Sequence, residues 1–312
     1  MENNTQLKEM IRSMVIDILQ GQKQEMASSQ PIKQVPRGQF EPGVFDTVDE
    51  AIQAAKAAQA RFEDCTLATR EKVIADIRAA MRPRVQELAQ KTVDETGMGR
   101  VADKVLKLNL TLDKTPGVED LVTECETGDN GMTLYELSAY GVIGAVTPST
   151  NPAETLICNT IGMLAAGNAV FFSVHPGAKH LSRLLVSELN QIIAKSIGIE
   201  NLIVTLREPS IESAQEMMLH PDVSLLVVTG GPGVVKQALQ SGKKVIGAGA
   251  GNPPAFVDET ADIKKAAQDI VLGASLDNNI LCIAEKSVVA MRQIEPLLVE
   301  EMVKAGCVLL EN

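Results

Sequence analysis

Between residues 142 and 249 the chain alternates short apolar segments with amphipathic ones, and this alternation restricts the fold more than any other feature of the sequence. The segments expected to be strands are GVIGAVTP, NAVFFSV, NLIVTL, VSLLVVTGG and KKVIGAG. Helical patterns follow several of them: AKHLSRLLVSELNQIIAKSI, SIESAQEMML and GVVKQALQS. The alternation predicts an α/β fold with a parallel, doubly wound sheet. Ligands are then expected at the carboxyl ends of the strands, where the loops lie.

Two long helices and a further strand are expected ahead of this region. Thr47 and Glu50 fit a capping box that opens the helix VDEAIQAAKAAQARFEDC. A second helix is expected from about Thr69 to Thr96, with Pro83 as a possible kink and GMG at its end. The stretch MTLYELSAY has residues typical of a β-strand.

Residues 1–20 form a separate unit in the sequence. Their apolar positions recur with helical spacing, at Leu7, Met10, Ile11, Met14, Val15, Ile18 and Leu19. A linker over 21–43, rich in Gln, Ser, Pro and Gly, separates this stripe from the globular sequence. The helix would dock either on its own parent domain or on another protein, and the pattern alone leaves both open.

Composition excludes several classes of function. A chain of 312 residues is expected to contain two or more folding units. The net charge of −11 argues against nonspecific nucleic-acid binding, although helix N-termini can still bind anionic ligands. No apolar run reaches the roughly 18 residues that span a bilayer. Three histidines and five widely spaced cysteines argue against a metal site and indicate free thiols in a reducing compartment.

Two glycine clusters differ in their context. GAGAGN at 247–252 is followed by two prolines and the strand-like AFVDE, so it lacks the helix that a dinucleotide-binding fingerprint requires. VTGGPGVV at 228–235 lies between an expected strand and an expected helix. Its glycines allow a ligand to approach the free N–H groups of the helix start.

The stretch DNNILCIAEKS contains Cys282 within an apolar strip. Cysteine is a residue that buries easily, so packing is the default interpretation of a lone cysteine. Catalysis is the alternative, and the composition does not decide between them.

Several of these stretches, in their order along the chain, carry a family resemblance. VTPSTNP, AAGNAVFFSVHPGA, VVTGGPG, GAGAGNPPAFVDETAD and DNNILCIAEKS, together with DETGMG and TPGVEDL, resemble the aldehyde dehydrogenase superfamily. Within it the chain is similar, from about residue 44 onward, to the CoA-acylating aldehyde dehydrogenases of bacterial microcompartments. The resemblance implies oxidation of acetaldehyde or propionaldehyde to the acyl-CoA, with NAD as cofactor rather than NADP and CoA as co-substrate.

The resemblance also implies roles for single residues. Cys282 falls at the position of the family's nucleophile, and either Thr150 or Asn151 at that of the side chain that holds the oxyanion. Ser173 falls where many relatives place a lysine for the cofactor ribose, which leaves the choice between NAD and NADP less secure. The full set of cofactor-binding residues expected on this basis is Thr147, Pro148, Ser173, His175, Thr229, Gly230, Gly231 and Gly249.

Structural roles are favoured over catalytic or binding roles for several residues near Cys282 and near the expected cofactor site. Asn278 and Asn279 would shape the cysteine loop or simply form a turn. Glu285 and Lys286 are expected to be a structural or solvated pair, and a structural role is favoured for His175 and His180. The remaining cysteines are treated as packing or incidental thiols: Cys65, Cys125, Cys158 and Cys307.

At one position the chain departs from the hydrolytic members of the resembled family. Those members carry a glutamate that activates water, and here Ala248 stands at the matching place. The absence of a base favours CoA as acyl acceptor, because a thiol needs less activation than water. A hydrolytic enzyme is therefore the weaker alternative.

The resemblance further implies a domain plan and partners. Residues 44–270 would form the cofactor-binding domain, with 132–146 contributing oligomer contacts, and 271–312 would begin a catalytic domain. The family's chain continues beyond AGCVLLEN by roughly a third of its length, so a fragment without activity is a second alternative. Residues 1–20 resemble a peptide that binds a microcompartment shell protein, which implies a cytoplasmic, encapsulated homo-oligomer. Neither nucleic-acid nor membrane partners are expected.

Overall fold

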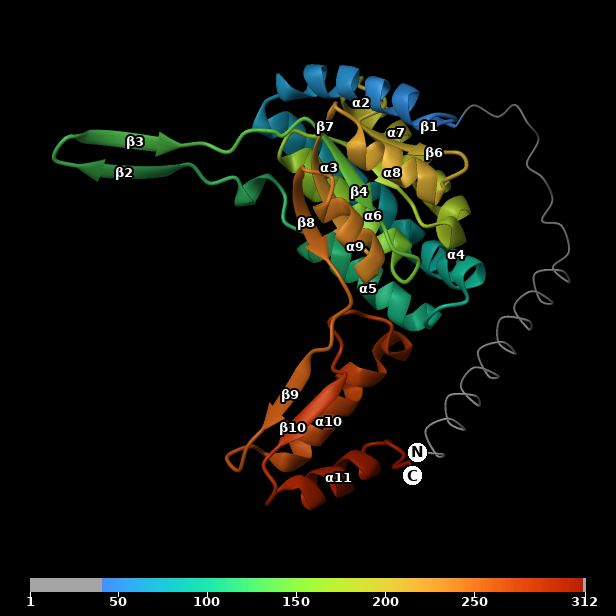
Figure 1. Cartoon of the computed structure of the whole chain (residues 1–312), viewed down its shortest axis with the longest axis vertical. Helices are drawn as coiled ribbons and strands as arrows, with labels where there is room; N and C mark the ends of the chain where they lie inside the picture. Colours follow the sequence, from blue (N-terminus) through green and yellow to red (C-terminus); the bar gives the residue numbers. More distant parts are fainter. Residues whose placement is uncertain (1–40, 311–312) are drawn as a thin grey trace, which may run out of the picture. The chain divides into compact units, whose positions relative to one another are not determined.

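The computed structural model describes residues 41–310. The helix expected at 1–20 and the linker through residue 40 lie outside the described residues. The described part contains a six-stranded sheet, an antiparallel hairpin and a second, two-stranded sheet (Figure 1).

The large sheet is parallel throughout, as the alternating pattern predicted. Its strand order is β1-β6-β5-β4-β7-β8. In that order the strands are β1 (Val44–Phe45), β6 (Ile203–Leu206), β5 (Ala169–Ser173), β4 (Val142–Val146), β7 (Val223–Thr229) and β8 (Lys244–Ala248). The side chains of β5 and β6 are buried along their whole lengths, which explains why these segments are continuously apolar.

The helices that connect these strands cover both faces of the sheet. On one face lie α6 (Pro152–Ala165) and α7 (Lys179–Ile197); on the other lie α2 (Val48–Glu63), α8 (Ile211–Leu219) and α9 (Pro232–Leu239). The chain moves outward from β4 to β5 and β6, and then crosses to β7 on the other side of β4. The loops after β4 and β7 therefore diverge to opposite faces, and a crevice forms at this switch point.

The two helices expected at the start of the domain are present, with one interruption. Thr47 caps α2, since its side chain accepts a hydrogen bond from the Glu50 N–H, and its hydroxyl donates to the Glu50 carboxylate at 2.8 Å. The helix expected over 69–96 is divided into α3 (Leu67–Met81), a 3-10 turn η1 (Arg82–Arg84) and α4 (Val85–Thr96). The break falls at Pro83, which has no N–H to continue the helix. Gly97, with φ of 65°, ends α4.

The strand expected over 132–140 ends earlier, at Tyr135. It is β3 (Gly131–Tyr135), and it pairs with β2 (Glu124–Gly128) in an antiparallel hairpin. Every residue of the hairpin is exposed. β2 was not predicted, because ECETG shows neither apolar alternation nor β-branched enrichment.

The last part of the chain forms a small α/β unit of its own. β9 (Pro254–Val257) pairs in parallel with β10 (Ser287–Ala290), and α10 (Ile263–Ser275) packs on α11 (Glu295–Lys304). A separate apolar cluster holds this unit together, built on Val257, Ala267, Ile270 and Leu298. The boundary expected at residue 270, between a cofactor-binding and a catalytic domain, stays a prediction, and β9 pairs across it with β10. The strand-like nature of AFVDE was correct.

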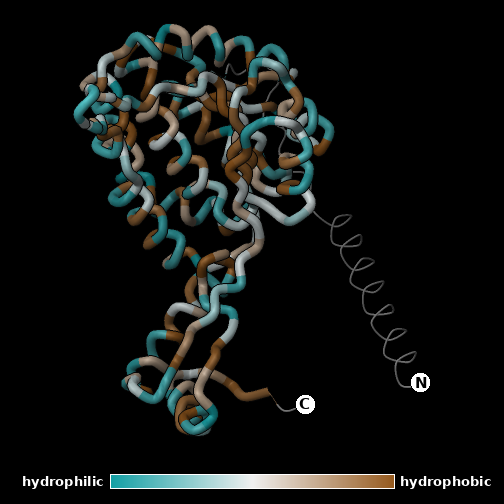
Figure 2. Tube along the Cα trace, turned by 60° about the vertical axis from the view of Figure 1, so that its left-hand side comes forward, coloured by the Kyte–Doolittle hydropathy of each residue, from teal (hydrophilic) through white to brown (hydrophobic). Residues whose placement is uncertain are grey.

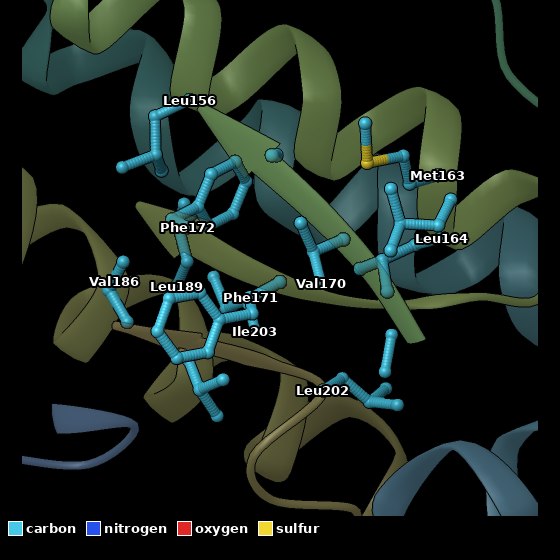
Figure 3. Packing of buried hydrophobic residues seen from close by; sticks show 14 of the residues in the cluster. Leu156, Met163, Leu164, Val170, Phe171, Phe172, Val186, Leu189, Leu202 and Ile203 are labelled. Atoms are coloured by element: carbon cyan, nitrogen blue, oxygen red, sulfur yellow. The ribbon is translucent and has the colours of Figure 1, made fainter. Parts of the chain in front are cut away.

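The main core is aliphatic, with two phenylalanines at its centre. Phe171 and Phe172 of β5 lie among side chains of α6, α7 and β6 (Figure 3). Figure 2 shows hydrophobic residues concentrated in the strands of the sheet and hydrophilic residues on the outer helices. Over residues 41–310, no helix combines the length and apolarity needed to cross a bilayer.

Candidate active site

The sheet brings several of the predicted site residues to one edge. Register pairs Val146 of β4 with Ser173 of β5 and with Val228 of β7. The Thr147 N–H donates to the Ser173 carbonyl at 3.1 Å, so these two residues are direct neighbours. On the other side, Thr229 pairs with Ala248, and the Gly230 N–H donates to the Ala248 carbonyl at 3.1 Å. Segments far apart in sequence thus meet at the switch point of the sheet.

Two features of this edge are typical of a ligand-binding site. The Thr147 side chain is 2% exposed and its hydroxyl has no hydrogen-bond partner among the described residues, so a polar group is left to be satisfied. Gly231 is the N-cap of α9 without a side-chain cap, and an added Cβ there would meet no atom within 4 Å. Free N–H groups at the start of α9 therefore face open space.

Two of the expected cofactor residues stand apart from these contacts. His175 is exposed, and its Nδ1 accepts a hydrogen bond from the Gly177 N–H at 3.0 Å, which caps the turn η3 (Pro176–Ala178). His175 thus makes a structural contact, and its expected contact with a cofactor stays a prediction. Gly249 lies after β8 with open space around its Cα, and no hydrogen bond within 41–310 ties it to the edge.

Cys282 lies in a loop that is closed by its own side chains. Asn279 Nδ2 donates to the Glu285 carbonyl at 3.1 Å, and Lys286 Nζ donates to the Leu281 carbonyl at 3.0 Å. Lys286 also donates to the Asn279 carbonyl at 2.7 Å. The structural role expected for Lys286 is thus visible in its contacts, although they are made to the loop and not to Glu285.

The thiol of Cys282 is free and exposed among the described residues, so it does not pack in their core, and its catalytic role stays a prediction. The GAGAGN turn lies against its backbone: a Cβ added at Gly251 would be 2.2 Å from the Cys282 carbonyl oxygen. The Lys286 N–H also donates to the Pro253 carbonyl at 3.0 Å. Only glycine at 251 permits this close approach.

The cysteine loop begins with three consecutive residues in the left-handed region. Asp277, Asn278 and Asn279 have φ values of 51°, 55° and 60°. Asp and Asn tolerate this conformation better than other non-glycine residues, but each such residue still costs energy. Surrounding contacts must therefore hold the turn in place.

Buried charges supply those contacts, and the sequence analysis did not anticipate them. Lys104 and Lys107 of α5 (Val101–Lys114) are almost fully buried, as is Asp277. Lys104 Nζ lies 3.0 Å from Asp277 Oδ2, and Lys107 Nζ contacts the same oxygen. Lys107 Nζ also lies 3.3 Å from Oε1 of Glu154, in the first turn of α6.

The titration of these groups follows from burial and pairing. Burial lowers the pKa of Lys104 and outweighs the attraction of Glu154 and Asp277. For Asp277 burial alone would raise the pKa, but hydrogen bonds from Lys107, the Arg100 N–H and Lys104 together lower it. Asp277 is thus held as a carboxylate.

The same two lysines hold the segment expected to stabilise an oxyanion. Lys104 Nζ donates to the Thr150 carbonyl at 2.6 Å, and Lys107 Nζ donates to Oδ1 of Asn151. Asn151 Nδ2 lies 3.3 Å from the Thr150 hydroxyl. Lys107 therefore joins Asn151 to Asp277 at the start of the Cys282 loop, and Lys104 joins Thr150 to the same aspartate. Among residues 41–310, no cluster of three or more His, Cys, Asp or Glu is arranged to hold a metal.

Comparisons with known proteins place this geometry in context. A profile described as "Aldehyde dehydrogenase family" matches residues 18–307. The CoA-propanoylating propanal dehydrogenase of Salmonella typhimurium is 49% identical over 308 residues, which covers 99% of this chain and 64% of that protein. The acetylating acetaldehyde dehydrogenase of Escherichia coli is 50% identical over 252 residues, or 80% of this chain and 54% of that protein.

Solved structures show the same similarity. A propionaldehyde dehydrogenase from the Clostridium phytofermentans fucose utilisation bacterial microcompartment superposes with a TM-score of 0.82 at 51% identity, covering 85% of this chain and 61% of that one. The propionaldehyde dehydrogenase of Rhodopseudomonas palustris, solved with bound CoA and an acylated cysteine, gives a TM-score of 0.81 at 51% identity, covering 84% and 60%. The chain spans about 64% of the length of the Salmonella typhimurium propanal dehydrogenase.

Proposed function

The chain belongs to the aldehyde dehydrogenase family, and on that premise we propose that it oxidises a short-chain aldehyde, propanal or acetaldehyde, to its acyl-CoA. The observation that carries the proposal is the exposed Cys282, which lies in a loop held by Lys286 and against Gly251, with Ala248 rather than a carboxylate at the end of β8. Two relatives that share about half of the aligned residues with this chain are a CoA-propanoylating propanal dehydrogenase and an acetylating acetaldehyde dehydrogenase.

The first half of the reaction forms a thioester. The Cys282 thiolate bonds to the carbonyl carbon, and the π electrons move to the oxygen. The Asn151 amide or the Thr150 hydroxyl, with a backbone N–H near Cys282, stabilises this oxyanion. A nicotinamide held at the switch point by Thr147, Ser173 and the β7–α9 turn would supply the acceptor for the hydride that leaves the carbon. As the C=O bond reforms, the acyl group stays on the Cys282 sulfur.

The second half transfers the acyl group. The CoA thiolate attacks the thioester carbon, and the Cys282 thiolate leaves. Water is the competing acceptor, but it would need a general base, and Ala248 offers none. The hydrolytic alternative is weaker for this reason.

The dinucleotide is proposed to bind at the switch point, against Thr147, Pro148, Ser173 and the turn Thr229–Gly231. The unsatisfied Thr147 hydroxyl and the open start of α9 support this position. NAD is proposed over NADP from the family resemblance, and Ser173, which stands where many relatives have a lysine, does not decide between the two. One engineered relative, a glycolyl-CoA reductase, was solved with NADP+, so the two cofactors should be compared directly.

Partners are also proposed. A second copy of the chain would contact residues 132–146, and a shell protein would bind residues 1–20 inside a microcompartment. The similarity to an enzyme from a fucose utilisation microcompartment supports the latter.

The test is NADH formation from propanal, with and without CoA. We expect CoA-dependent NADH that is lost in Cys282→Ala and kept in Cys125→Ala, a matched change at an exposed thiol on the hairpin. Equal NADH without CoA would favour the hydrolytic alternative. No NADH under any condition would favour the inactive fragment.

A further inference from the structure

The cluster of Lys104, Lys107, Glu154 and Asp277 lies between two segments that the proposed reaction needs. Its side chains are at most 9% exposed. Burying ions in this way costs several kcal/mol per ion, and well-packed apolar residues often give equal or better stability. Stability alone therefore does not explain why charges occupy these positions.

The chemistry of lysine fixes the orientation of the Asn151 amide. An ammonium group has three donors and no acceptor, so the atom of Asn151 that faces Lys107 must be the carbonyl oxygen. The Nδ2 group then points away from Lys107, toward the Thr150 hydroxyl, as an N–H donor. Without Lys107 either end of the amide could face this side.

The same ammonium also reaches the Cys282 loop. Lys107 contacts Asp277, whose carboxylate accepts the Arg100 N–H at 2.8 Å and whose own N–H donates to Asp103 at 2.9 Å. Asp277 opens the left-handed turn that leads through Asn279 to Cys282. Any shift of Asp277 would therefore displace the loop.

We propose that Lys107 is a positioning residue: it sets the Asn151 amide with Nδ2 as the available donor and, through Asp277, holds the Cys282 loop in register with that amide. The inference rests on the proposed function for its catalytic meaning, and on the contacts alone for its structural meaning. Lys104 makes a second link between the same two segments, because it binds both the Thr150 carbonyl and the Asp277 carboxylate.

The primary test compares Lys107→Met with Lys114→Met, an exposed lysine on the same helix. Hydrogen exchange of a peptide over 276–286 should become faster in Lys107→Met and stay unchanged in Lys114→Met. This measurement needs no activity, so it remains decisive even if the chain does not oxidise aldehydes. Unchanged exchange in a folded Lys107→Met protein would overturn the proposal.

A second test separates positioning from stability. Lys107→Met combined with Asp277→Asn removes one cation and one anion. The double variant should therefore have a melting temperature closer to that of the wild type than Lys107→Met alone has. Where aldehyde oxidation is present, kcat should remain roughly 10- to 100-fold low at nearly constant KM, since loss of a whole oxyanion donor costs about 10²–10³. Recovery of kcat together with stability would show that the cluster is only structural.

Discussion

Two lysines of α5 are buried while two leucines of the same helix are exposed. Lys104 and Lys107 are buried, whereas Leu106 and Leu110 are 61% and 59% exposed. The sequence VADKVLKLNLTLDK does contain the signal, because Lys104 lies at helical spacing with the buried Leu108 and Leu112. No role was predicted for these lysines, so the polar network behind Thr150 and Asn151 was not predicted.

The lowered pKa of Asp277 makes a prediction about acid stability. A carboxylate whose pKa is lower in the folded state stabilises the protein above its unfolded value of about 3.9, and the effect disappears as the pH falls through the folded value. Asp277→Asn should therefore lower the urea midpoint at pH 7. The difference in urea midpoint between the variant and the wild type should become smaller as the pH falls below about 4.

The matched control is Asp269→Asn, an exposed carboxylate paired with Lys265 at the surface. Exposed pairs contribute about 0–1 kcal/mol, so this variant should stay close to wild type across the same range. A deficit for Asp277→Asn that stays constant with pH would mean that the loss arises from packing and not from charge.

β4, β5, β6 and β7 were predictable because they are apolar and mostly buried, with Gly, Pro or Asn close to their ends. β8 was predicted from KKVIGAG although most of its residues are exposed, and the two-residue strand β1 was not predicted. The candidate site was expected at the carboxyl ends of these strands, and the residues after β4 and β7 lie where the strand order reverses. The pairing of β9 with β10 was beyond the sequence, because nothing local to PAFV or SVVA specifies a partner about thirty residues away. The contact of Gly251 with the Cys282 loop depends on that pairing.

The turn between β7 and α9 provides a prediction for cofactor binding. Gly231→Val should fold normally, because an added Cβ meets no atom within 4 Å, and should weaken NAD binding by covering the start of α9. Gly230→Val is a poorer test, since its Cβ would lie 2.6 Å from Val234 Cγ1. Fluorescence titration with NAD measures the change.

Gly162→Val serves as the control for this substitution, because Gly162 of α6 also has open space around it. Its NAD affinity should match that of the wild type. Equal affinity in Gly231→Val would remove the β7–α9 turn from the proposed cofactor site.

At the scale of the whole molecule, the exposed hairpin predicts self-association. Met132 and Leu134 are 71% and 59% exposed, and the nearby Leu137 is 73% exposed. Apolar side chains gathered on a projecting hairpin are typical of an interface. A Leu134→Glu substitution should lower the molecular mass found by light scattering, while Glu124→Gln on the opposite strand should not. A monomeric wild type would contradict the proposal that 132–146 mediates oligomer contacts.

Residues 1–20 give the second prediction at this scale, which concerns targeting. Fused to a fluorescent protein, the segment should produce puncta in cells that make microcompartment shells and diffuse fluorescence in cells that do not. Replacing Ile11 and Leu19 by Glu should abolish the puncta, because both lie on the apolar stripe. Diffuse fluorescence of the unchanged fusion in shell-producing cells would contradict targeting.

Deleting residues 1–20 tests whether the stripe instead packs on the parent domain. Full burial of an aliphatic side chain is worth about 1.5–3 kcal/mol, so docking of even three of them would contribute several kcal/mol. For a chain of this size that amount corresponds to a fall of roughly 10 °C in melting temperature. We expect the deletion to lower it by only about 2 °C, because a segment that binds a shell protein must keep its apolar face available. A fall in melting temperature of roughly 10 °C would mean that the apolar stripe is buried against the parent domain. The segment would then have to detach from that domain before it could bind a shell protein.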